Sequence, residues 1–117
     1  MKEIVIFGAT GDLCRRKLIP ALYKLHNKGL LPEDLVITGT ARRDPGRDNW
    51  IKSLGEEYSE EFLHRLDYIS SDLTVIKSLK NLATASTDTT FFLSVPPDRY
   101  GDAIINLKKA GKLNDPE

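Results

Sequence analysis

The chain has 117 residues and one cysteine, and its 17 lysines and arginines are balanced by 17 aspartates and glutamates. This length holds one domain at most, and the zero net charge argues against nucleic acid or an anionic membrane surface as the main partner. One cysteine excludes an internal disulfide and a cysteine-rich metal site, so we expect no metal. Because no apolar run is long enough to span a membrane, we expect a soluble, cytoplasmic protein.

Strands and helices alternate along the chain. Residues 3–7 are rich in Ile, Val and Phe and predict a strand that Gly8 ends. Apolar residues at helical spacing then predict a helix that begins at Asp12 and ends before Gly29, and Pro20 inside it predicts a kink. The later predicted elements are a strand at 35–39, a helix after residues 44–46, a short helix at 59–66 that starts with a capping box, a strand at 67–70, a helix marked by Val75, Leu79 and Leu82, a strand at 89–95 and a helix at 98–110.

This alternation predicts an α/β fold. Parallel strands joined by right-handed crossovers carry helices on both faces of the sheet, which gives a Rossmann-like three-layer sandwich. The predicted strands correspond to the first half of a dinucleotide-binding sheet, with the expected order 3-2-1-4. The polar residues 112–117 stand where a fifth strand would be expected. We therefore interpret residues 1–117 as the N-terminal part of a dinucleotide-binding domain that stops before its later strands.

The segment Gly8-Ala9-Thr10-Gly11 lies between the first strand and the first helix. Glycines there allow a tight turn and let a pyrophosphate approach the backbone amides of the helix N-terminus. Cys14 takes the position of a third small residue, where we expect it to pack rather than to react. Glycines end many strands that bind no ligand. A glycine turn after the first strand of a chain in which strands and helices alternate, however, favours a dinucleotide-binding site. The turn lacks the Gly-Lys-Ser/Thr ending of NTPase loops, which disfavours ATP hydrolysis.

The end of the second predicted strand indicates which dinucleotide binds. The sequence there is Gly39-Thr40-Ala41-Arg42-Arg43, without a carboxylate before Asp44 to accept from a ribose 2′-hydroxyl. A guanidinium can hold a 2′-phosphate through two parallel hydrogen bonds, which favours NADP. The alternative is that both arginines are solvated loop charges.

Longer motifs resemble the N-terminal signature of glucose-6-phosphate dehydrogenase. The resemblance extends over essentially the whole chain, in order and at the family's spacing. It rests on Gly8-Ala9-Thr10-Gly11-Asp12-Leu13, Arg16-Lys17-Leu18-Ile19-Pro20-Ala21-Leu22, Gly29-Leu30-Leu31-Pro32, Gly39-Thr40-Ala41-Arg42 and Phe92-Leu93-Ser94-Val95-Pro96-Pro97.

The resemblance implies a set of cofactor contacts. Arg42 would meet the 2′-phosphate of NADP, and Asp72-Leu73 would lie beside the adenine nucleoside unless they are an ordinary helix cap and first-turn residue. Phe92 would lie near the cofactor, or else in the core. The pyrophosphate would be wrapped by Gly8, Ala9, Thr10, Gly11, Asp12, Leu13, Cys14 and Arg15.

The resemblance also implies what the chain lacks. Lys17 would bind the phosphate of the sugar, although a solvated lysine explains it equally well. The family continues with a Glu-Lys-Pro-Phe-Gly segment and a later histidine that acts as general base, and we expect neither here. His26 and His64 read as surface or partly packed residues, so we assign no catalytic residue.

The leading hypothesis is the coenzyme-binding part of an NADP-dependent glucose-6-phosphate dehydrogenase, inactive by itself. Glucose 6-phosphate would bind only with the missing C-terminal part. An exposed edge strand can pair with a second copy of the chain, so a homo-oligomer is also compatible with the sequence. The alternative is a stand-alone module that binds or senses NADP without catalysis. A short-chain reductase is disfavoured because none of the tyrosines is followed by lysine at the Tyr-x-x-x-Lys spacing.

Overall fold

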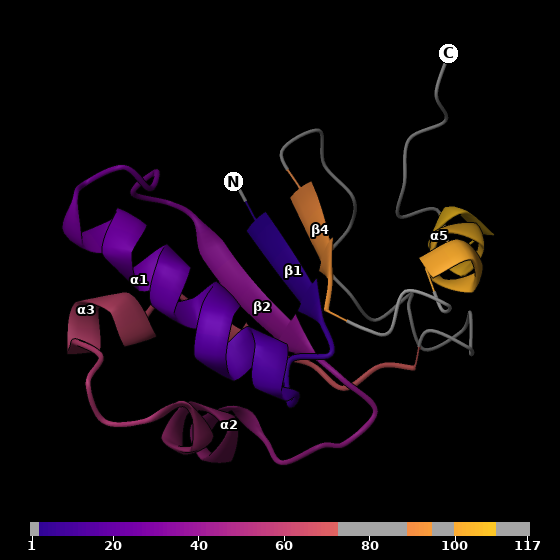
Figure 1. Ribbon diagram of the computed structural model, residues 1–117, viewed down its shortest axis with the longest axis horizontal. Helices are drawn as coiled ribbons and strands as arrows, with labels where there is room; N and C mark the ends of the chain where they lie inside the picture. Colours follow the sequence, from indigo (N-terminus) through magenta and orange to yellow (C-terminus); the bar gives the residue numbers. More distant parts are fainter. Residues whose placement is uncertain (1–2, 73–88, 95–99, 110–117) are drawn as a thin grey trace.

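The computed structural model describes residues 3–72, 89–94 and 100–109 (Figure 1). A parallel sheet with the strand order β3-β2-β1-β4 forms its centre, which confirms the order predicted from the sequence. Phe7 at the end of β1 is in register with Thr40 of β2 and with Leu93 of β4, so these strands end level with one another. The strands are β1 (Glu3–Phe7), β2 (Val36–Thr40), β3 (Leu66–Tyr68) and β4 (Thr89–Leu93).

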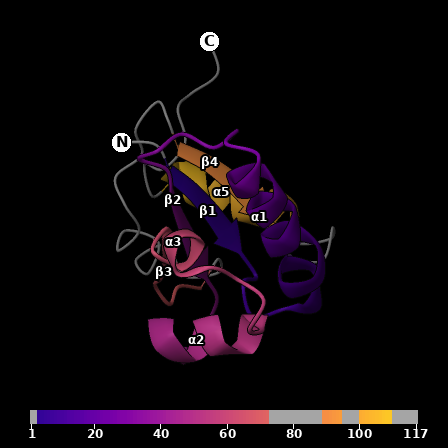
Figure 2. The ribbon, with the colours of Figure 1, turned by 90° about the vertical axis from the view of Figure 1, so that its left-hand side faces the viewer.

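One helical layer packs against the face of the sheet that carries Ile6 and Ile37. Figure 2 shows α1 at one side of the sheet, and both ribbon views draw α2 below it, on the side toward which β1 and β2 run. The buried side chains of this layer include Ile19, Trp50 and Phe62. The helices are α1 (Ile19–Asn27), α2 (Arg47–Leu54), α3 (Glu60–Leu63) and α5 (Tyr100–Lys109). The predicted helix around Val75, Leu79 and Leu82 lies outside the described residues.

A π-helical turn at Cys14–Leu18 precedes α1. Its widened geometry is visible in the N–H of Ile19, which donates to the carbonyl of Cys14 five residues earlier. Pro20 lies in the first turn of α1, but the chain before it is already helical. A proline there has no N–H to donate and its ring crowds the carbonyl four residues earlier, which the widened π-helical turn accommodates. The irregularity that the sequence predicts at Pro20 is found one turn earlier, as a π-helical turn.

Several predicted boundaries differ from the structure by one or more residues. β2 runs one residue later than predicted, and β3 begins one residue earlier than predicted and ends at Tyr68. Backbone hydrogen bonds continue beyond β3, since the N–H of Ile69 donates to the carbonyl of Gly39 at 3.1 Å. The helix expected at 59–66 is shortened to α3, and only half of its capping box forms. The Ser59 side chain accepts from the N–H of Phe62 at 3.3 Å. The second hydrogen bond of a capping box needs a Glu or Gln at the position of Phe62, which would accept from the backbone N–H of Ser59. Residues 95, 98, 99 and 110 of the last predicted elements lie outside the described residues.

Candidate functional site

The carboxyl ends of β1, β2 and β4 meet at one edge of the sheet, and Gly8–Gly11 follows β1 at this edge. We call these residues the glycine turn. Gly8 has a φ of 80°, and the N–H groups of Gly8 and Ala9 donate to the carbonyl of Thr40 at 3.0 and 3.1 Å. The N–H of Gly11 donates back to the carbonyl of Gly8 at 3.0 Å. The turn is thus closed on itself and fixed to the end of β2.

The glycine turn leads directly into the helical segment and faces solvent. Thr10, Gly11, Asp12 and Leu13 are exposed. The first amides of a helix have no partner within it and carry partial positive charge, so they favour an anion. The Arg15 guanidinium lies beside this segment, 2.6 Å from the Asp12 carboxylate.

Cys14, unlike the exposed residues just before it, is buried in the core. Its side chain is completely buried in the core, and burial raises the pKa of its thiol to about 12. The whole residue is 0% exposed, so Cys14 supports the segment by packing, as the sequence predicts.

Ala41–Arg43, which we call the arginine loop, follows β2 at the same edge. The N–H of Ser71 donates to the carbonyl of Ala41 at 2.9 Å, and the Tyr68 hydroxyl donates to the carbonyl of Arg43 at 2.6 Å. The side chains of Arg42 and Arg43 are exposed. The loop is therefore anchored through its backbone to the chain after β3, while both guanidinium groups remain available to solvent.

The other predicted residues are spread around this edge. Asp72 is half-buried beyond the end of β3, and Leu73 lies outside the described residues. Phe92 on β4 is 40% exposed in this chain. Lys17 is exposed on the π-helical turn.

Trp50 supports the glycine turn from below, a role that the sequence did not reveal. Its indole N–H donates to the carbonyl of Ala9 at 3.0 Å, and 1% of the residue is exposed. Gly39 makes room for the ring, since a Cβ built at Gly39 would lie 2.6 Å from Cζ2 of Trp50. Apolar spacing marks Trp50 only as a core residue, because Ala9 is distant in the sequence.

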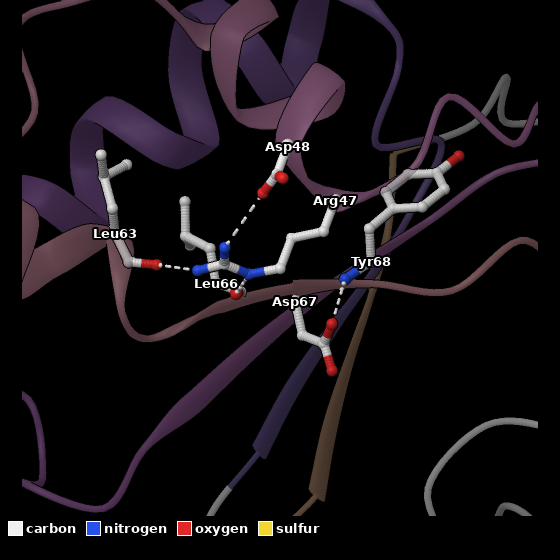
Figure 3. A network of polar contacts seen from close by, with 6 residues as sticks. All are labelled: Arg47, Asp48, Leu63, Leu66, Asp67 and Tyr68. Atoms are coloured by element: carbon white, nitrogen blue, oxygen red, sulfur yellow. Dashed lines mark hydrogen bonds and ion pairs between the residues drawn. The ribbon is translucent and has the colours of Figure 1, made fainter.

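Arg47 holds α2, and with it Trp50, against β3. Its Nε donates to the carbonyl of Leu66 at 2.7 Å and its Nη2 donates to the carbonyl of Leu63 at 2.9 Å (Figure 3). The Asp48 carboxylate lies 3.5 Å from Nη1. The guanidinium therefore clamps the start of α2 onto the chain on both sides of the turn between α3 and β3.

A depression at the opposite edge of the sheet is lined by His26, Glu33, His64 and Arg65, near the start of β2. Arg65 donates from Nε to Nδ1 of His26 at 3.1 Å, and from Nη1 to the carbonyl of Pro32 at 2.7 Å. His26 is half-buried and His64 exposed, which confirms the prediction for both histidines. Within the described ranges, no His, Cys, Asp and Glu side chains gather in a group that could hold a metal ion, and no helix is long and apolar enough to cross a membrane.

Comparisons with known proteins agree with this geometry. The glucose-6-phosphate 1-dehydrogenase of Gluconobacter oxydans is 34% identical over an aligned length of 127 residues, which covers 92% of this chain and 26% of that enzyme. The crystal structure of glucose-6-phosphate 1-dehydrogenase from Mycobacterium avium superposes with a TM-score of 0.79 at 32% identity, over 96% of this chain and 27% of that chain. A structure titled as glucose-6-phosphate dehydrogenase in complex with its substrate glucose-6-phosphate gives a TM-score of 0.76 at 26% identity, over 93% of this chain and 27% of that chain.

The chain thus spans about a quarter of the length of the relatives that it matches. A family model described as "Glucose-6-phosphate dehydrogenase, NAD binding domain" matches residues 5–117. With the parallel sheet, the glycine turn and this match, the chain belongs to the NAD-binding domain family of glucose-6-phosphate dehydrogenase.

Proposed function

We propose that the chain is the coenzyme-binding part of an NADP-dependent glucose-6-phosphate dehydrogenase, which oxidises glucose 6-phosphate to 6-phosphogluconolactone in the pentose phosphate pathway of the cytoplasm. One observation carries the proposal. The carbonyl of Thr40 accepts from both Gly8 and Ala9, and Arg42 follows only two residues later. The glycine turn and the arginine loop are therefore joined at one point, as a ligand with a pyrophosphate and a 2′-phosphate requires.

The residues present fit such a dinucleotide. A side chain at position 11 would be crowded, since a Cβ built on Gly11 would lie 3.3 Å from the carbonyl oxygen of Gly8. Because glycine has no side chain, a pyrophosphate can approach the backbone closely there. Arg42, with Arg43 beside it, would hold the 2′-phosphate by charge-assisted hydrogen bonds. When bound, NADP accepts the hydride, and this chain's own residues bind and orient its phosphate groups.

Other residues complete the proposed site at the same edge. Asp72 and Leu73 would lie beside the adenosine, and exposed Phe92 would contact the cofactor from β4. Lys17 would bind the phosphate of glucose 6-phosphate. We assign no catalytic residue, because His26 and His64 line the opposite edge. Substrate binding and a homo-oligomer are proposed only together with the additional polypeptide that the relatives have.

Calorimetric titration of the chain with NADP and with NAD tests this function. Arg42→Ala should weaken NADP binding by about 10-fold or more, since hydrogen bonds to a charged group contribute about 1.5–3 kcal/mol, and it should leave NAD binding unchanged. Lys28→Ala is the matched control, because it removes an exposed charge just beyond the end of α1. A folded chain that binds neither dinucleotide, or an Arg42→Ala variant that binds NADP as tightly as the control, would contradict the proposal.

A further inference from the structure

Two aromatic side chains lie under the proposed site, and each one holds a different loop. Trp50 of α2 donates to the carbonyl of Ala9 in the glycine turn, and Tyr68 at the end of β3 donates to the carbonyl of Arg43 in the arginine loop. The two rings contact each other, with centroids 5.5 Å apart and planes inclined by 46°. Trp50 is 1% exposed and Tyr68 8% exposed. The pair forms a continuous buried link between the two loops.

The Trp50 hydrogen bond has a consequence for the amide that follows Ala9. In a trans peptide the C=O of one residue and the N–H of the next point in opposite directions. The chain has no cis peptide in the described residues, so a carbonyl of Ala9 that points inward to Trp50 aims the N–H of Thr10 outward. Thr10 is exposed, so an N–H aimed away from Trp50 is available to an anion at the glycine turn.

The Tyr68 hydrogen bond fixes the main chain beside the arginines. Burial, together with the negative charge of Asp44, raises the pKa of the Tyr68 hydroxyl, so this group remains a donor at neutral pH. A fixed carbonyl at Arg43 limits how far the backbone of the arginine loop can move. The main chain that carries the two arginines therefore starts from a defined position, which lowers the backbone entropy lost on binding.

We propose that Trp50 and Tyr68 are positioning residues, which we call the aromatic bracket: Trp50 orients the glycine turn for the pyrophosphate, and Tyr68 orients the arginine loop and thereby favours NADP over NAD. The inference rests on the proposed function, because it assigns roles at the same dinucleotide site. Neither side chain needs to touch the ligand, since both act through backbone carbonyls.

Three ligands separate the two roles. NADP carries both the pyrophosphate and the 2′-phosphate, NAD carries only the pyrophosphate, and adenosine 2′-monophosphate carries only the 2′-phosphate. Trp50→Phe, which removes the indole N–H and keeps an aromatic ring, should weaken NADP and NAD about fivefold and leave adenosine 2′-monophosphate unchanged. Tyr68→Phe should weaken NADP and adenosine 2′-monophosphate about fivefold and leave NAD unchanged.

Tyr58→Phe is the matched control for both variants. Tyr58 is 8% exposed in the same core, and its hydroxyl makes no hydrogen bond to the described residues of the glycine turn or the arginine loop. Removing that hydroxyl should change none of the three affinities. Thermal unfolding of each variant reports packing losses, which would lower all three affinities together. An unchanged ratio of NADP to NAD affinity in Tyr68→Phe, or an equal loss for all three ligands in Trp50→Phe, overturns the proposal.

The unmodified chain offers a test that does not depend on the folding of a variant. It contains one tryptophan, so its ¹H–¹⁵N spectrum has one indole signal. That signal should shift on addition of NADP or NAD and should not shift with adenosine 2′-monophosphate. An indole signal that stays in place while either dinucleotide binds contradicts the role of Trp50. If the folded, unmodified chain binds no dinucleotide at all, the proposed function itself fails.

Discussion

The thiol of Cys14 is buried beneath the helical segment that follows the glycine turn. Burial raises the pKa of this thiol from 9.0 to about 12, because the thiolate would lose its hydration. Tyr58, buried in the same core beside the carboxylate of Glu57, has a pKa that is also raised to about 12. Both groups are thus neutral at physiological pH, and neither is suited to proton transfer.

The buried Cys14 thiol makes the free energy of unfolding depend on pH in the alkaline range. A group whose pKa is higher in the folded chain stabilises the fold fully below its unfolded pKa of 9.0 and loses that contribution as the pH rises toward 12. Between pH 8 and pH 10, the free energy of unfolding should fall by about 1 kcal/mol more in the unmodified chain than in Cys14→Ala. Urea titrations at the two pH values measure this difference. Parallel losses in both proteins would show that burial of Cys14 is not coupled to its protonation.

At the level of elements, α2 packs against β2 where Gly39 leaves room for Trp50. Gly39 of β2 lies under the indole of Trp50, and a Cβ at Gly39 would lie 2.6 Å from Cζ2, 2.7 Å from Cη2 and 2.9 Å from the Cβ of Ala9. Arg47 clamps the start of α2 through the carbonyls of Leu63 and Leu66, which leaves the helix little freedom to retreat. A change in the strand at Gly39 is therefore transmitted to the helix and, through Trp50, to the glycine turn.

Gly39→Ala should push Trp50 away from the glycine turn. Overpacking of a dense core typically costs about 1–3 kcal/mol, so the variant should unfold at a temperature several degrees lower. It should also bind dinucleotides more weakly than its loss of stability explains. Gly101→Ala in α5 is the control, because a Cβ there meets nothing within 4 Å and alanine favours a helix. Equal melting temperatures and affinities for the two variants would contradict this account of the β2–α2 contact.

The parts of the fold that depend on local patterns could be predicted from the sequence. Alternating apolar strands and helices give the parallel order, and the glycines between β1 and the first helix mark the turn. The exact strand ends differed, because an apolar run does not determine where a regular strand begins and ends; β3 ends at Tyr68, although the N–H of Ile69 still donates to the carbonyl of Gly39. The aromatic bracket could not be predicted, since Trp50 and Ala9 are 41 residues apart and nothing local pairs them.

At the scale of the whole molecule, the carboxyl ends and the amino ends of the parallel strands carry different chemistry. The carboxyl edge of the sheet carries the glycine turn and the arginine loop, whose exposed groups favour anions. The amino edge carries the depression in which Arg65 is tied to His26 and to backbone carbonyls. Because the net charge of the chain is zero, local positive groups rather than the overall field must attract a dinucleotide.

The most direct test of this account is an amide ¹H–¹⁵N titration of the chain with NADP. Binding at the carboxyl edge predicts the largest shifts at residues 8–15 and 41–43, with the indole of Trp50 moving in step. The residues around His26, Glu33 and Arg65 should keep their positions throughout the titration. Shifts centred on that amino-edge depression, with the glycine turn unaffected, would contradict the central claim that this family member binds its coenzyme where β1 and β2 end.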